Sequence, residues 1–225
     1  MSMGRKERIN CPKCQNSGSF VIWEIIDTAE EEKNMKEQVM SGEAFLFECP
    51  FCKNKVNVDY GLLYHQIEDM LMIQYAQTDE AVQEGIESFA FMKSGQLPGF
   101  ELADDYRFRV VRSQNEIREK ILINDCGLDD RAIELMKIFM LSEIQQTTPN
   151  LQYKDFLFDT DEEGKPCFLL RTMDGQNGTI DFIQEVYDSI KEQFVVELKE
   201  DESVVVDLNW AMSILDAGQG DGMTS

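Results

Sequence analysis

The sequence predicts an α+β protein, with an N-terminal β module that contains an inserted helix and a C-terminal α+β region. Three observations carry this prediction. Two Cys-Pro-x-Cys motifs occupy residues 11–14 and 49–52. Segments rich in β-branched and aromatic residues flank both motifs, as is typical of strands. Beyond residue 78, segments with the 3.6-residue period of helices alternate with strand-like segments.

The composition indicates a strongly acidic protein. Its 225 residues include 21 basic and 43 acidic side chains, giving a formal charge of −22, and this length suits one large or two small domains. Residues up to Thr78 hold 8 basic and 12 acidic side chains, and the remainder holds 13 and 31, so −18 of the charge follows Thr78. Such a field repels phosphate backbones and anionic membranes, which disfavours a nucleic-acid partner.

The sequence also bears on the cellular compartment. No stretch approaches the roughly 20 apolar residues that a membrane-spanning helix needs, and no apolar segment of a secretory signal follows the basic residues at the start. The cysteines are grouped in pairs rather than spread like a disulfide framework, which is typical of a reducing compartment. We therefore expect a cytoplasmic protein with no membrane segment.

Residues 1–77 form the predicted N-terminal domain. Its expected elements are strands at 19–26, 44–47, 55–60 and 71–75 and a surface helix at 28–40. Thr28 and Glu31 have the spacing of a capping box for that helix. Each Cys-Pro-x-Cys motif then lies between short strands, so the domain is predicted to be a zinc ribbon-like β module.

The two motifs supply four thiolate ligands, Cys11, Cys14, Cys49 and Cys52. Cysteines three positions apart can both contact one ion when the backbone between them turns sharply, with Zn–S distances of about 2.3 Å. Four sulfurs leave no open coordination position, so we predict one structural zinc ion per chain. A pair of redox dithiols and an iron–sulfur centre are the alternatives that use the same cysteines.

The residues after each motif give two further expectations. Gln15 and Lys53 stand where zinc knuckles commonly have glycine, and each is followed by an asparagine. We expect Asn16 and Asn54 to adopt the left-handed backbone conformation, which asparagine tolerates. His65 is the single histidine, and with four cysteines available we expect it to pack or hydrogen-bond rather than to act as a fifth ligand.

The residues around both motifs resemble the CpXC protein family of bacteria and archaea. The resemblance rests on residues 9–14, 47–52 and 59–65, and residues 109–131 look like the region that follows in longer members. The family is defined by two Cys-Pro-x-Cys motifs and has no assigned activity. The resemblance therefore implies a zinc-ribbon module in a cytoplasmic protein and, residue by residue, only the four cysteines.

Residues 78–213 form the predicted acidic α+β domain, with a further boundary near 147–150 and a flexible tail at 214–225, which has little apolar content after residue 216. A capping box at 113–116 and Gly127 bracket one of its expected helices. The predicted helices span residues 78–92, 113–126, 130–146 and 183–190, and the predicted strands span 106–111, 156–158, 168–170, 179–182, 194–198 and 204–208.

The helix at 130–146 is apolar on nearly all sides, as is typical of a central core helix. The alternative is that one side of it, between Ile133 and Ile144, also contacts a second copy of the chain in a homodimer.

These features favour a protein-interaction or scaffold protein with an unidentified protein partner and a structural zinc site. We do not expect an enzyme, because the sequence contains no G-x-S-x-G motif, phosphate loop or H-E-x-x-H motif. Two alternatives stay open. One is a nucleic-acid-binding zinc ribbon, for which the basic residues are Arg5, Lys6, Arg8 and Lys13. The other is an enzyme with an unrecognised site in the C-terminal region.

Overall fold

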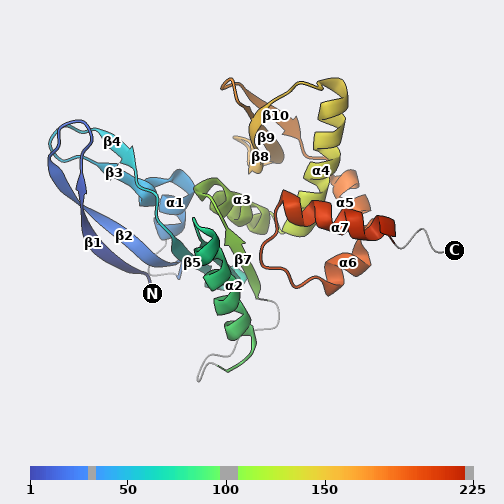
Figure 1. The fold of residues 1–225 in the computed structure, drawn as a ribbon, viewed down its shortest axis with the longest axis horizontal. Helices are drawn as coiled ribbons and strands as arrows, with labels where there is room; N and C mark the ends of the chain where they lie inside the picture. The colour runs from blue at the N-terminus through green and yellow to red at the C-terminus, as the bar shows by residue number, and fades with distance from the viewer. Residues whose placement is uncertain (30–33, 97–105, 221–225) are drawn as a thin grey trace. The chain divides into compact units, whose positions relative to one another are not determined.

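A computed structural model describes residues 1–29, 34–96 and 106–220 (Figure 1). The predicted α+β class is confirmed. The chain forms two compact units, Met1–Arg118 and Glu119–Ser225, which we describe separately. Among the described residues no helix combines the length and the apolar character needed to cross a membrane.

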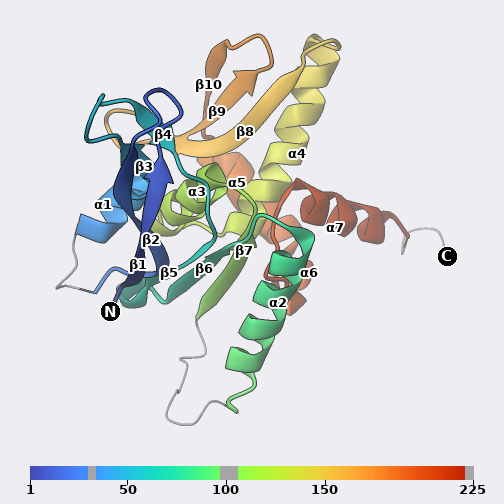
Figure 2. The ribbon, with the colours of Figure 1, turned by 60° about the vertical axis from the view of Figure 1, so that its left-hand side comes forward.

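The first unit is built on a five-stranded mixed sheet with the order β1-β2-β5-β6-β7 (Figure 2). The strands are β1 (Met3–Asn10), β2 (Ser17–Asp27), β5 (Leu62–Gln66), β6 (Leu71–Tyr75) and β7 (Arg107–Val111). The pairs β1–β2 and β5–β6 are antiparallel, whereas β2–β5 and β6–β7 are parallel. A separate antiparallel pair joins β3 (Leu46–Glu48) to β4 (Lys55–Asn57).

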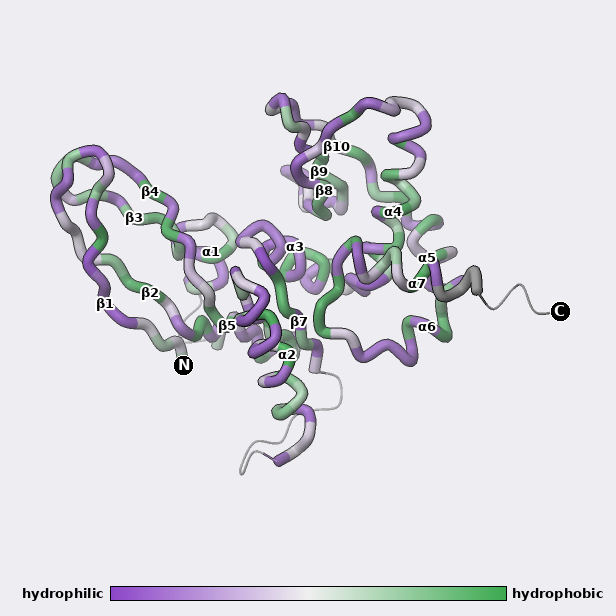
Figure 3. The backbone as a smooth tube through the Cα atoms, viewed as in Figure 1, coloured by the Kyte–Doolittle hydropathy of each residue, from purple (hydrophilic) through white to green (hydrophobic). Residues whose placement is uncertain are grey.

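Strand β1 was not predicted from the sequence. Its residues MGRKERIN are exposed apart from the partly buried Ile9, and the tube in Figure 3 is hydrophilic along much of this strand. A strand that buries neither face has no apolar alternation to reveal it. Its charged side chains suit an edge strand, because they discourage pairing with a further strand.

Two helices that begin in the first unit have recognisable caps. Helix α2 (Asp79–Lys93) follows Thr78, whose hydroxyl accepts a hydrogen bond from the Ala81 amide at 3.2 Å. Ser113 caps α3 (Gln114–Asp125) as predicted, because its hydroxyl accepts from the Glu116 amide at 3.2 Å. Helix α1 is described from Asn34 to Ser41, and the capping box predicted with Glu31 lies outside the described residues. The 3-10 turns η2 and η3 span Glu43–Phe45 and Ile67–Asp69.

The division between the units differs from the predicted boundary after residue 77. Strand β7 pairs with β6 from Leu71↔Arg107 to Tyr75↔Val111, so β7 completes the first sheet, and α2, which precedes it in the chain, belongs to the same unit. The compact units divide after Arg118 instead. The boundary expected near 147–150 is the linker between two elements inside the second unit, because α4 ends at Thr147 and β8 begins at Tyr153.

Among the described residues, the second unit places the end of α3, helices α4 to α7 and a three-stranded sheet around one apolar core. The sheet has the order β10-β9-β8. Helix α4 supplies much of the core, as predicted, through Ile133, Leu135, Met136 and Leu141. The elements are α4 (Asp130–Thr147), β8 (Tyr153–Thr160), β9 (Pro166–Thr172), β10 (Asn177–Asp181), α5 (Gln184–Gln193), α6 (Val195–Glu200) and α7 (Leu208–Gly220).

Two predictions at the end of the chain were wrong. The expected strand at 194–198 is largely helix α6, and the expected strand at 204–208 does not form, since helix α7 begins at Leu208. Phe194 and Leu198, four positions apart, are buried, while Val195 and Val196 are 57% and 59% exposed. The pattern of burial is therefore helical, although β-branched residues favour strands.

The predicted tail is also partly ordered. Helix α7 extends to Gly220, and residues 221–225 lie outside the described residues. Ile214 and Leu215 follow Trp210 and Ala211 by four positions, and all four contact the core. This helical spacing explains why the segment continues as a helix.

Five buried charged side chains form a network inside the second unit. Lys137 Nζ lies 2.5 Å from Glu119 and 3.1 Å from Glu134. Lys120 Nζ lies 3.0 Å from Glu134 and 3.1 Å from Asp130. Glu119 also accepts a hydrogen bond from the Phe158 amide at 2.6 Å, which ties α3 to strand β8.

The same network shifts two carboxyl pKa values in opposite directions. Burial raises the pKa of Glu119. Burial acts the same way on Glu134, but the ammonium groups of Lys120 and Lys137 outweigh it and lower the pKa of Glu134. Each of these charged side chains has a partner of opposite charge at contact distance. Removing one side chain therefore leaves its partner buried and unpaired.

We expect Lys137→Met to lower the free energy of unfolding by about 3–5 kcal/mol, because it leaves buried carboxylates without their cation. Urea denaturation measures this change. The control is Lys165→Met, since Lys165 pairs with Glu163 on the surface with a side chain that is 71% exposed, and such pairs contribute less than about 1 kcal/mol. Equal stability of the two variants would contradict a stabilising network.

Candidate metal centre

The two Cys-Pro-x-Cys motifs form tight turns, which we call the knuckles, between successive strands. The first knuckle links β1 to β2, and the second links β3 to β4. In the first, the Cys11 amide donates to the Asn16 carbonyl, and the Gln15 amide donates to the Cys11 carbonyl, both at 2.9 Å. In the second knuckle the Cys49 amide donates to the Asn54 carbonyl at 2.9 Å, and the Lys53 amide donates to the Cys49 carbonyl at 3.0 Å. The repeated motif therefore folds twice into one local structure.

The residue after each second cysteine has a left-handed backbone. Gln15 has φ 61° and Lys53 has φ 59°. Asn16 and Asn54 were predicted to adopt this conformation, and that prediction was wrong. The turn requires a positive φ at the position where glycine is common. Gln15 and Lys53 occupy this position, although a side chain in this conformation costs about 1–2 kcal/mol.

The knuckles bring the four predicted cysteines together. The Sγ atoms of Cys11 and Cys52 are 3.6 Å apart, as are those of Cys14 and Cys49, and all four sulfurs lie within 4.8 Å of one another. These distances exceed the disulfide length of about 2.05 Å, and all four are free thiols. Four sulfurs about 2.3 Å from one tetrahedral zinc ion would be about 3.8 Å apart, so the cluster fits a metal ion of this kind.

Apolar side chains pack beneath the sulfurs. Cys11 and Cys49 are fully buried, and Phe47 lies with them in a small cluster that Phe20 contacts edge-on. Gly18, which the sequence did not single out, faces this cluster directly. A Cβ atom there would lie 2.8 Å from atoms of Phe47 and Pro50, so only glycine lets β2 approach the second knuckle this closely.

Backbone amides and neighbouring sulfurs shift the thiol pKa values in different directions. The amides of Cys14 and Lys13 point at the Cys11 sulfur and lower its pKa to about 6. The Asn16 amide lowers the pKa of Cys14. At Cys52 the Asn54 amide also lowers the pKa, but partial burial and the other sulfurs outweigh it and raise the pKa to about 12. The backbone amides thus favour thiolates at Cys11 and Cys14, and ionising all four adjacent sulfurs requires a cation.

The remaining candidate ligands lie outside the cluster. His65 hydrogen-bonds through Nε2 to the Tyr106 hydroxyl, and its Nδ1 lies 3.6 Å from Asp27. Partial burial lowers its pKa. His65 therefore packs and hydrogen-bonds as expected. Cys126 and Cys167 are also absent from the four-cysteine group. Within the described part of the chain, the site thus offers sulfur ligands alone.

The fold and the site define a class: an α+β protein in which two knuckles build a four-cysteine cluster that could hold a metal ion. The chain belongs to the CpXC family, because the family model described as CpXC protein matches residues 9–137. The resemblance found in the sequence is thereby confirmed. No curated protein and no solved structure matches the chain.

The knuckle backbone gives a stability test. We expect Lys53→Gly to be about 1 kcal/mol more stable to urea than Lys53→Ala, because only glycine relieves the left-handed strain. Comparing these two variants cancels the loss of the exposed contact between Lys53 and Glu48.

The matched control is Asn54→Gly against Asn54→Ala. At Asn54 the backbone is not left-handed, so glycine should be the less stable member of that pair. If glycine raised the stability to urea at position 54 and not at position 53, the left-handed backbone assigned to Lys53 would be contradicted.

Proposed function

We propose that this protein is a zinc-ribbon protein in which one structural zinc ion is held by Cys11, Cys14, Cys49 and Cys52, and that it acts by binding a protein partner. The observation that carries the proposal is the spacing of the four sulfurs, all within 4.8 Å. Thiolates in this number are typical of structural zinc sites. An iron–sulfur centre uses the same ligands, and metal analysis separates the two. Because the ligands must stay reduced, a cytoplasmic location suits the site.

A catalytic role for the ion has little support. Catalytic zinc sites keep one position for water or substrate, and four sulfurs fill a tetrahedral ion. His65 is held by Tyr106 and Asp27. We therefore propose a binding function rather than an enzymatic one.

Exposed apolar side chains support a partner that is a protein. Phe51, at the second knuckle, is 65% exposed. In the second unit a groove beside α4 is lined mainly by apolar side chains. Exposed apolar surface of this kind is typical of protein-interaction sites.

Nucleic-acid binding is the second candidate. It is favoured by Phe51, which offers a ring on which a base could stack, and by Lys13, Lys53 and Lys55, which lie on or beside the two knuckles. The formal charge of −22 opposes it.

Metal analysis of the purified full chain tests the zinc proposal. We expect about one zinc and no iron per chain, and loss of the zinc in Cys11→Ser, because three sulfurs hold the ion less tightly. Cys126→Ser is the control, since Cys126 lies outside the cluster and its loss should leave the zinc in place. A metal-free protein with all four thiols reduced, or one that contains iron, would contradict the proposal.

A binding assay with a labelled single-stranded oligonucleotide tests the second candidate. We expect no saturable binding to the full chain at about 0.15 M salt, because the acidic surface repels phosphates. Saturable binding that Phe51→Ala abolishes and that Phe91→Ala preserves would instead favour nucleic-acid binding. Phe91 is the control because it is 49% exposed on α2, away from both knuckles.

A further inference from the structure

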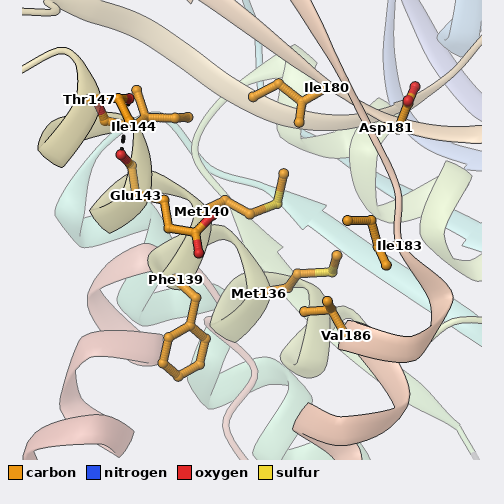
Figure 4. Close-up of a pocket in the computed structure, with 10 residues that line it drawn as sticks. All are labelled: Met136, Phe139, Met140, Glu143, Ile144, Thr147, Ile180, Asp181, Ile183 and Val186. Carbon is orange, nitrogen blue, oxygen red and sulfur yellow. Dashed lines mark hydrogen bonds between the residues drawn. The ribbon is translucent and has the colours of Figure 1, made fainter.

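An apolar groove lies between three elements of the second unit (Figure 4). Helix α4 contributes Met136, Met140 and Ile144, strand β10 contributes Ile180, and Ile183 and Val186 lie at the start of α5. The groove has a volume of about 330 Å³. Figure 4 shows side chains from all three elements facing a common space.

The walls of the groove reach the surface. Ile183 is 50% exposed, Phe139 is 39% exposed and Val186 is 37% exposed. A small molecule at the floor would leave these side chains in water, whereas a macromolecular partner would cover them. Methionines on the floor allow the surface to adapt to a partner, because their side chains are unbranched and flexible.

The charge around the groove is negative. Its charged lining residues are Glu143 and Asp181, and no lysine or arginine lines it among the described residues. Residues 119–225 contain 8 basic and 23 acidic side chains. A partner that places apolar side chains in the groove would therefore gain from cations at its flanks.

The same charges argue against a second copy of the chain as the occupant. A two-fold interface would pair the groove with itself. It would then bring two copies of Glu143 and Asp181 together without a cation from the groove lining, and like charges across an interface disfavour association.

We propose that this groove binds a basic amphipathic helix of a protein partner, with apolar side chains in the groove and lysine or arginine facing Glu143 and Asp181. Recognition of a helix by an apolar groove is a recurring mode of protein binding. The proposal rests on the proposed interaction function and deepens it by naming the chemistry of the partner.

Methionine methyl NMR of the full chain tests the proposal with a defined probe. The probe is an 18-residue amphipathic peptide of leucine and lysine, and its matched control has glutamate at every lysine position. We expect the basic peptide to shift the methyl signals of Met136 and Met140. Met173 and Met212, which are 68% and 47% exposed outside the groove, are internal controls and should not shift.

Variants locate the binding site. Val186→Lys should weaken binding of the basic peptide at least tenfold, because it places a cation among the apolar contacts. Val195→Lys on α6 should not weaken this binding. The double variant Glu143→Gln/Asp181→Asn should weaken it about threefold to tenfold, whereas Glu192→Gln/Glu200→Gln should leave binding within twofold. A thermal melt of each variant checks that it is folded.

Three results would overturn the proposal. They are equal binding of the acidic and basic peptides, no shift of Met140 with either peptide, and methyl shifts that depend on protein concentration without peptide, which would place a second copy in the groove. If any of these occurs while metal analysis still finds one zinc, the groove assignment fails and the zinc proposal stands.

Discussion

Four cysteine sulfurs within 4.8 Å of one another impose the constraint on which the first unit depends. Two unit charges about 4 Å apart repel by about 4 kcal/mol at an effective dielectric constant of about 20, so thiolates this close need a cation. The knuckles that carry them are separated along the chain, with Cys14 and Cys49 35 positions apart. One ion would therefore fix the hairpin of β1 and β2 against the pair of β3 and β4.

The second unit is stabilised by different chemistry. Its apolar core forms around α4. Its buried cations lie at contact distance from carboxylates, as Lys137 does from Glu119 at 2.5 Å. It needs no metal ion for these contacts. The two units also offer different surfaces, since the knuckles expose Phe51 and the second unit presents an apolar groove with acidic edges. We therefore propose an architectural role for the metal centre and a recognition role for the groove.

The sequence predicted the parts of this structure that local chemistry determines. The four cysteines, the cap at Ser113 and the core helix α4 each follow from residue type and spacing. Features set by tertiary contacts were missed. The parallel pairing of β6 with β7 joins segments far apart in the chain, and Gly18 matters only because Phe47 lies against it. Residues 194–198 have strand propensity, but burial of one helical face decides their structure.

The central claim is that four sulfurs hold one zinc ion. X-ray absorption at the zinc edge of the purified full chain tests it most directly, because it reports the type, number and distance of the ligand atoms. The account predicts four sulfur neighbours at about 2.3 Å and no nitrogen or oxygen ligand. A zinc environment with two or more nitrogen or oxygen ligands would contradict it.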